Sequence, residues 1–188
     1  MRIEIKAILT ASFFYNFAAG LFGPIYAIYV ENIGGDILTA GAASSLFSFV
    51  IGILVLLFGL LEDNKLNKKA MLIIGYLIIA FGNIGYLFVS NTAHLFIIQI
   101  VNGVGLAVII PSLDGIYSKN IDRGKESSEW AYWEGGTRII YAAAALAGGF
   151  IASAYGFNAL FIIMAGCAFA SSFACAAFIN KKHFKTKR

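Results

Sequence analysis

The basic residues of this 188-residue chain are gathered into four short stretches that alternate with long apolar runs. Thirteen of the fourteen Lys and Arg residues lie in Met1–Lys6, Glu62–Lys69, Lys119–Glu129 and Lys181–Arg188. The turns that separate these stretches contain no Lys or Arg; they are Glu31–Asp36, Asn91–His94 and Tyr155–Asn158. A chain that crosses a bilayer repeatedly keeps its short basic loops in the cytoplasm. The pattern therefore predicts a multi-pass protein of the plasma (inner) membrane, with a cytoplasmic N-terminus at residues 1–6 and a basic cytoplasmic tail at 181–188.

The composition identifies lipid as the expected solvent. Hydrophobic residues make up 60% of the chain and charged residues 13%, with a mean hydropathy of +0.81. Soluble domains carry about 25% charged residues. The pI near 9.1 does not indicate a nucleic-acid partner, because the basic residues lie at the ends of apolar spans rather than along one face. They are expected to hold loops at the anionic inner leaflet.

The apolar runs are long enough for helical membrane spans. A bilayer core requires about 20 apolar residues per helix, and helices satisfy their backbone polar groups internally. Six segments meet this requirement: Ala7–Val30, Ile37–Leu61, Ala70–Ser90, Leu95–Ser118, Trp130–Ala154 and Ala159–Asn180. The predicted fold is an all-α membrane protein in which residues 1–188 form a single bundle of six transmembrane helices. Pro24 and Pro111 lie inside spans, where each is expected to kink the helix or loosen a turn.

Small residues predict where the helices approach one another closely. In the fourth span they recur every four positions, at Gly103, Ala107, Pro111 and Gly115. In the last span Cys167, Ser171 and Cys175 form a similar stripe, also at spacings of four. Small residues on one helix face favour close helix packing in membranes. The cysteine spacing suggests neither a disulfide framework nor a metal site, and no metal or cofactor is expected.

Three charged residues fall inside the predicted spans, namely Asp114, Glu134 and Arg138. A charge at the bilayer centre costs about 2.5–3.5 kcal/mol on insertion scales, so such residues usually have partners or functions. Glu134 and Arg138 are four residues apart and share one helix face. They form either a substrate or proton site in a central cavity or an ion pair that only neutralises itself. Asp114 is expected to point into the bundle, as a protonatable group or as a partner of a cytoplasmic Lys.

Uncharged polar residues inside the spans are further candidates for a cavity lining. Each amide in lipid must find a hydrogen-bond partner or line water. The amides in question are Asn16, Asn83, Gln99 and Asn102, and Tyr141 is ambiguous between a cavity lining and an interface anchor. No nucleophile elbow, phosphate-binding glycine loop or paired-His metal motif is present in the sequence. The chain is therefore not expected to be an enzyme.

A loop between the second and third spans contains a recognisable pattern. It reads Gly59-Leu60-Leu61-Glu62-Asp63-Asn64-Lys65-Leu66-Asn67-Lys68-Lys69. This resembles the signature loop of the major facilitator superfamily (MFS), with Gly59, Asp63, Lys68 and Lys69 at the matching positions. The fourth span and the Gly148-Gly149 pair of the fifth are similar to the same family. An Asp facing basic groups at a helix end can act as a cytoplasmic latch, which assigns these four residues to a gating loop.

The resemblance implies a fold and a pairing requirement. Members of the family have two six-helix bundles, each made of two inverted three-helix repeats, with the substrate bound between the bundles. This chain is similar to the N-terminal half bundle. One bundle offers half a cavity, so we expect pairing with a second copy or with a second six-helix half.

The resemblance also implies a function, a half-size secondary active transporter that moves a small organic solute by alternating access, with H+ as the candidate coupling ion and efflux as the candidate direction. The expected substrate-binding or proton-coupling residues are Asn16, Gln99, Asn102, Asp114, Glu134, Arg138 and Tyr141. The alternative is a non-transporting membrane module or a truncated half of a full-length carrier.

Overall fold

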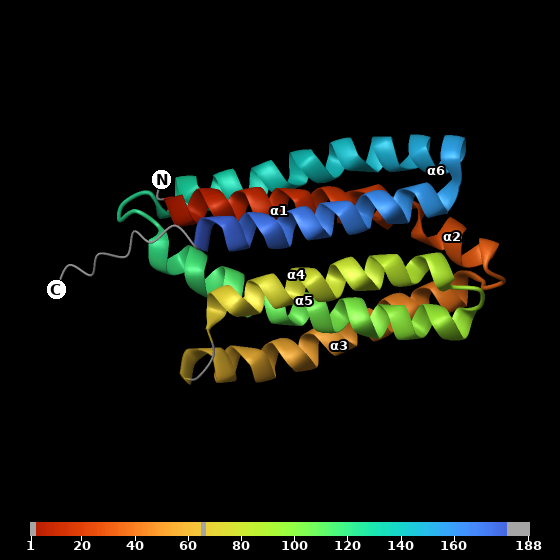
Figure 1. The fold of residues 1–188 in the computed structure, drawn as a ribbon, viewed down its shortest axis with the longest axis horizontal. Helices are drawn as coiled ribbons and strands as arrows, with labels where there is room; N and C mark the ends of the chain where they lie inside the picture. Colours follow the sequence, from red (N-terminus) through yellow and green to blue (C-terminus); the bar gives the residue numbers. More distant parts are fainter. Residues whose placement is uncertain (1–2, 65–66, 180–188) are drawn as a thin grey trace.

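The computed structural model describes residues 3–64 and 67–179, and every regular element in these ranges is helical (Figure 1). The elements in chain order are α1 (Ile3–Phe22), η1 (Gly23–Ile25), α2 (Tyr26–Asn32), α3 (Ile37–Asn64), α4 (Lys68–Gly85), η2 (Tyr86–Phe88), α5 (Thr92–Asn120) and α6 (Glu126–Ile179). Five of the helices in the described residues are long and apolar enough to cross a membrane, where α1, η1 and α2 count as one. The predicted membrane-spanning, all-helical class agrees with this architecture.

The last two predicted spans lie within one element, α6, and are divided by a kink at Gly156. At 54 residues a straight α6 would be about 80 Å long, far more than the roughly 30 Å of a bilayer core. Gly156 departs from helical geometry, with φ 79° and ψ 171°, and the chain reverses direction there (Figure 1). We call the segments before and after Gly156 the first and second arms of α6. A positive φ is easily adopted only by glycine, so a single residue makes a turn that was predicted to span Tyr155–Asn158.

The first predicted span is also divided. Pro24 lies in the 3-10 turn η1, which separates α1 from α2. Proline has no amide proton to donate, so the α-helical ladder is interrupted there and the tighter turn replaces it. Pro111, in contrast, lies inside an uninterrupted α5. The expected loosened turn is therefore confirmed at Pro24, whereas at Pro111 the helix continues.

The helix ends differ from the predicted limits at the basic loops. Helix α1 begins at Ile3, so it includes part of the predicted cytoplasmic N-terminus. Helix α3 ends at Asn64, inside a segment predicted as a loop. Helix α6 likewise begins inside a predicted loop, at Glu126. Charged residues can continue a helix beyond the bilayer core because water satisfies their side chains. The basic tail, residues 181–188, lies outside the described residues.

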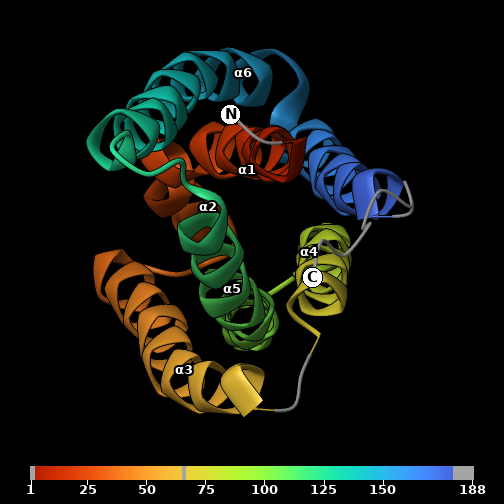
Figure 2. The ribbon, with the colours of Figure 1, turned by 90° about the vertical axis from the view of Figure 1, so that its left-hand side faces the viewer.

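The helices form an asymmetric bundle (Figure 2). Helix α1 packs along α6 and lies between its two arms, while α4 packs against both α5 and α6. Helix α3 lies at the edge, where it packs mainly on α5. The most apolar 18-residue window of α3 contains no buried residue. One flank of the bundle is thus a thin, strongly apolar wall.

Glycines set the two closest helix approaches. A Cβ on Gly148 of α6 would lie 2.6 Å from the carbonyl carbon of Leu21 and 2.7 Å from its Cα, so only glycine permits this contact with α1. A Cβ on Gly75 of α4 would lie 2.9 Å from the carbonyl oxygen of Gly105. The predicted stripe on α5 also makes a contact, because a Cβ on Gly103 would lie 3.2 Å from the carbonyl oxygen of Phe47 in α3. Bare backbone at these points lets the helices approach closely.

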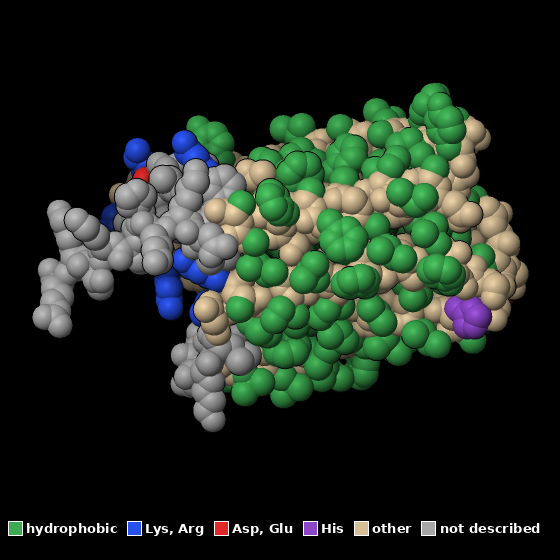
Figure 3. Space-filling model, viewed as in Figure 1, with side chains coloured by type: hydrophobic (Ala, Val, Ile, Leu, Met, Phe, Trp, Pro, Cys, Tyr) green, Lys and Arg blue, Asp and Glu red, His purple; other side chains and the backbone are tan. Residues whose placement is uncertain are grey.

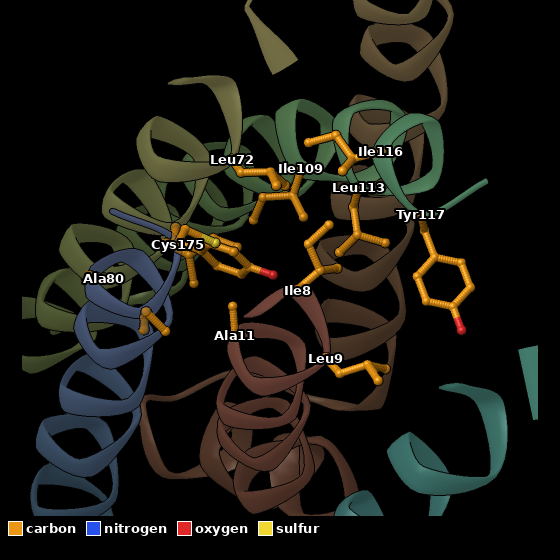
Figure 4. Packing of buried hydrophobic residues seen from close by; sticks show 14 residues of the cluster. Ile8, Leu9, Ala11, Leu72, Ala80, Ile109, Leu113, Ile116, Tyr117 and Cys175 are labelled. Atoms are coloured by element: carbon orange, nitrogen blue, oxygen red, sulfur yellow. The ribbon is translucent and has the colours of Figure 1, made fainter. Parts of the chain in front are cut away.

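The buried apolar residues form two clusters along the bundle axis. One joins α1, α4, α5 and α6 and includes Leu72, Ile109 and Cys175 (Figure 4). The other is aromatic, with Phe161 stacked on Tyr86 at a ring-centroid distance of 4.8 Å. The cysteine stripe of the last span belongs to this packing, because the Ser171 hydroxyl donates to the Ala11 carbonyl oxygen at 2.8 Å. The predicted packing role of that stripe is confirmed.

The basic and the hydrophobic side chains occupy different parts of the bundle surface. On the face shown in Figure 3, the Lys and Arg side chains gather at the end that carries the start of α1, and His94 lies at the opposite end. On this face, hydrophobic side chains are spread over the surface between the two ends. The end of α6 lies beside the start of α1, as expected for an even number of passes (Figure 1).

Candidate functional site

Five of the predicted site residues line one cavity of about 310 Å³. They come from three helices: Asn16 from α1, Asp114 from α5, and Glu134, Arg138 and Tyr141 from the first arm of α6. Asn16 thus shares a cavity with residues that lie 98 or more positions away in the sequence, as the sequence analysis expected. We refer to this space as the charged cavity.

Arg138 and Glu134 form a loose pair at the edge of the charged cavity. The closest approach of Arg138 Nη2 to Glu134 Oε2 is 4.0 Å, and the two side chains are 83% and 61% exposed. A pair of this length and exposure contributes little to stability, on the order of 0–1 kcal/mol. The guanidinium is therefore held weakly by its own bundle and is presented outward, where it can meet another charged group.

Asp114 is an exposed residue that lines the charged cavity together with Glu134. Asn16 donates from Nδ2 to the carbonyl oxygen of Ser12 in its own helix at 2.8 Å. The cavity therefore has two carboxylates and one guanidinium at its rim and an amide partly satisfied within α1.

Gln99 and Asn102 lie elsewhere, in a second cavity of about 240 Å³ between α1, η1, α2, α3, α4, η2, α5 and α6. Gln99 Nε2 donates to the Tyr26 hydroxyl at 2.6 Å, and the Tyr86 hydroxyl donates to Gln99 Oε1 at 3.3 Å. No Asp, Glu, Lys, Arg or His lines this space, which we call the neutral cavity. The prediction that grouped these two amides with Arg138 in one site is corrected, because Tyr15 forms part of the wall of both cavities and lies between the two sets.

The sequence analysis overlooked two residues that belong to these cavities. Tyr86 lines the neutral cavity, and Thr137 lines the charged one, where its hydroxyl donates to the Glu134 carbonyl oxygen at 3.0 Å. A signal for Tyr86 was present, because Tyr86 precedes the predicted turn Asn91–His94 by five residues and Gln99 follows it by five. Antiparallel neighbours joined by a short turn bring such positions together. Thr137 is one helical turn from Glu134, which is a comparable signal.

The predicted gating loop is described only in part. Gly59 lies in α3 near Pro111 of α5. A Cβ added at Gly59 would lie 4.0 Å from the Cβ of Pro111. Lys68 and Lys69 begin α4, and Lys68 Nζ would be 3.1 Å from a Cβ added at Gly115 of α5. The Asp63 side chain lies outside the described residues. The described part of the motif thus lies where α3, α4 and α5 meet.

A metal site has no support in the described residues. Within residues 3–64 and 67–179, no group of three or more His, Cys, Asp or Glu side chains could hold an ion. Cys167 and Cys175 are free thiols. The candidate sites in the described residues are therefore the two cavities.

Comparisons with known proteins agree with this architecture. Residues 8–188 match the family model of the Major Facilitator Superfamily. The chain is 23% identical over 166 residues to the multidrug resistance protein MdtG of Salmonella typhimurium, which covers 86% of this chain and 41% of that protein. The MdtG proteins of Salmonella dublin and Klebsiella pneumoniae match with the same identity, over 41% and 40% of their lengths. The chain thus spans about two-fifths of the length of these curated relatives.

The family match covers nearly all of the described helices, including both arms of α6 and every residue that lines the two cavities. The chain belongs to the Major Facilitator Superfamily, a family of multi-pass membrane transporters.

Proposed function

We propose that this bundle forms one half of a secondary active transporter that moves a small organic solute by alternating access. The observation that carries the proposal is the outward-facing Arg138, whose side chain is 83% exposed on a helix that otherwise belongs to an apolar bundle. A lipid-facing Arg at membrane depth costs about 2.5–3.5 kcal/mol on insertion scales. A second bundle across the charged cavity removes that cost by enclosing the guanidinium.

The proposed topology has six passes. The two arms of α6 each cross the bilayer, and the helices group into two inverted repeats of three, as in other carriers of this architecture. The end rich in Lys and Arg faces the cytoplasm of the plasma (inner) membrane, which places both termini there. The hydrophobic side chains between the two ends support a bundle that spans the bilayer (Figure 3).

The charged cavity supplies the chemistry for solute binding. Arg138 attracts an anionic group of the solute, while Asn16 of α1 and Tyr141 of α6 contribute hydrogen bonds. Glu134 offsets part of the positive charge, and its protonation strengthens anion binding, which couples the solute to H+. Asp114 is nearer the cytoplasmic end and is proposed to tune the gate. Efflux is the proposed direction, since the matched relatives are named multidrug resistance proteins.

The experiment is transport into proteoliposomes that contain the purified chain, with and without a pH gradient. A panel of radiolabelled aromatic and aliphatic carboxylates and amines is tested in both gradient directions. We expect gradient-dependent movement of at least one compound, lost in Arg138→Ala and uncoupled from pH in Glu134→Gln. Arg123→Ala is the matched control, because Arg123 is exposed in the loop between α5 and α6 and lines neither cavity.

Pairing is tested separately by crosslinking. In a background in which Cys167 and Cys175 are replaced by Ala, a cysteine at Ala142 lies on the face of Arg138, one turn further along α6. We expect this variant to form disulfide-linked dimers in membranes, because a second copy is the proposed partner. A cysteine at Phe173, exposed on the second arm, serves as the control. Equal crosslinking at both positions, or monomers alone, would argue against self-pairing.

A further inference from the structure

The neutral cavity has the composition of a binding site for an uncharged group. Its polar lining consists of hydroxyls and carboxamides, and none of its lining residues is an Asp, Glu, Lys, Arg or His. A charged group that entered such a space would lose its hydration without gaining a counter-charge, which is strongly unfavourable. The neutral cavity therefore disfavours ions, because it lacks the charged side chains that line the charged cavity.

One amide of this wall, Asn83, has hydrogen-bonding capacity that the protein does not use. Asn83 is 4% exposed and lines the cavity, and within the described ranges its side chain has no hydrogen-bond partner. Asn102 differs, because its unpaired Oδ1 has less than 1 Å² of accessible surface and lies against Gly82, where a ligand in the cavity does not reach it. Buried amides are almost always paired, so an unpaired Asn83 in the cavity wall is unusual. A ligand that both donates and accepts hydrogen bonds would satisfy the Asn83 amide.

The position of Asn102 depends on a glycine. A Cβ on Gly82 of α4 would lie 2.8 Å from Asn102 Cγ, so the amide occupies space that any other residue would fill. On the adjacent wall, Gln99 is held between Tyr26 and Tyr86 by its two hydrogen bonds. Gln99 is thus hydrogen-bonded at both ends of its amide and Asn102 is packed against Gly82, which leaves Asn83 as the amide that faces the cavity without a partner.

The rest of the wall is aromatic and limits the size of the occupant. Tyr15, Phe22 and Phe47 line the cavity and offer ring faces and edges to a planar group. The volume of about 240 Å³ is below the roughly 300–1,000 Å³ of sites that hold whole drug-sized ligands. It suits one substituted ring rather than an extended molecule.

We infer that the neutral cavity binds the uncharged planar part of a solute, a single aromatic ring that carries a carboxamide-like donor and acceptor, with Asn83 as its hydrogen-bonding partner. The inference rests on the proposed function only in taking this ligand to be part of the transported solute; the binding itself does not require transport. Since Tyr15 also borders the charged cavity, an ionised tail of the same solute would lie next to Arg138.

The test is equilibrium binding of three probes to the full chain in detergent micelles, measured by ligand-observed NMR. Benzamide, benzoate and benzamidinium share one ring and differ in charge at neutral pH. We expect saturable benzamide binding that weakens about tenfold in Asn83→Leu, the typical consequence of losing one buried hydrogen bond. Asn158→Leu is the matched control, because Asn158 is exposed near the α6 reversal and lines neither cavity. Thermal unfolding of each variant verifies that it is folded.

The outcomes separate this inference from the proposed function. Benzamide binding that is lost in Asn83→Leu and kept in Arg138→Ala supports the neutral site even if no transport is measured. Benzamide binding that Arg138→Ala abolishes and Asn83→Leu leaves intact assigns the probe to the charged cavity and overturns the inference. Absence of saturable benzamide binding to the folded protein, or equal binding of all three probes, also overturns it and leaves the transport proposal standing.

Discussion

The contact between α1 and the first arm of α6 allows a stringent test, the substitution Gly148→Ala. The new Cβ would lie 2.6 and 2.7 Å from two backbone atoms of Leu21, and closer still to its carbonyl oxygen. Ordinary van der Waals contact begins near 3.4 Å, so the two helices must separate by about 1 Å or more. Backbone cannot rotate away as a side chain can, and overpacking of this kind costs roughly 1–3 kcal/mol.

The adjacent residue provides the control. A Cβ on Gly149 meets nothing within 4 Å in the described part of the bundle. Both substitutions give the helix the same gain in propensity, about 0.5–1 kcal/mol, so their difference isolates the packing clash. We expect Gly148→Ala to lower the midpoint of thermal unfolding in detergent by several degrees relative to Gly149→Ala, at about 2–4 °C per kcal/mol for a chain of this size. If Gly148→Ala proves as stable as Gly149→Ala, the assigned α1–α6 contact is wrong.

Substitutions at three further positions test other parts of the bundle. Asp36 accepts hydrogen bonds that cap α3, which lowers the pKa of its carboxyl group, so Asp36→Ala should lower the unfolding midpoint near neutral pH, while Asp36→Asn should largely preserve it. Because the folded-state pKa is the lower one, the stabilisation is present above the ordinary value of 3.8 and should disappear as the pH is decreased through the folded-state pKa; a wild-type–alanine difference that persists at low pH would exclude the carboxylate as its cause. Ser171→Ala removes the buried hydrogen bond to the Ala11 carbonyl and should cost about 0.6 kcal/mol in denaturant-induced unfolding; no loss would show that the bond has no net value. Tyr26→Phe removes the acceptor for Gln99 Nε2 and should cost on the order of 1 kcal/mol by the same measurement; unchanged stability would mean that water replaces the hydroxyl.

The distribution of charge was sufficient to predict the general class of this protein. Lys and Arg avoid the bilayer core and remain in cytoplasmic loops, so their spacing along the chain reveals which segments are spans. The membrane-spanning helical class was predictable for this reason, whereas the family was predicted from the resemblance of the loop from Gly59 to Lys69. The ends of the helices were harder to predict from the sequence. Helix α3, for example, continues beyond the bilayer core to Asn64, where the hydropathy of the sequence has already fallen.

Helix periodicity located the candidate site only in part. Glu134 and Arg138 share a face because they lie one turn apart, and that relation holds in any straight helix. Gln99 and Arg138 lie on different helices, and whether their faces meet depends on how each helix is rotated about its own axis. Contacts such as that of Gly103 with α3 and the hydrogen bond between Gln99 and Tyr26 determine this rotation. Sequence spacing contains no such information, which is why one predicted site became two cavities.

From its sequence alone, this chain had to enter a membrane as helices, because only lipid can solvate so much apolar surface and only helices satisfy the backbone there. The tertiary structure decided what remained: the reversal at Gly156, the glycine contact with Leu21, the separation of charged from neutral polar groups on either side of Tyr15, and the outward position of Arg138. Each of these depends on the packing of residues that are distant in sequence. Partition between water and lipid acts on each segment by itself, whereas packing acts on all of them together.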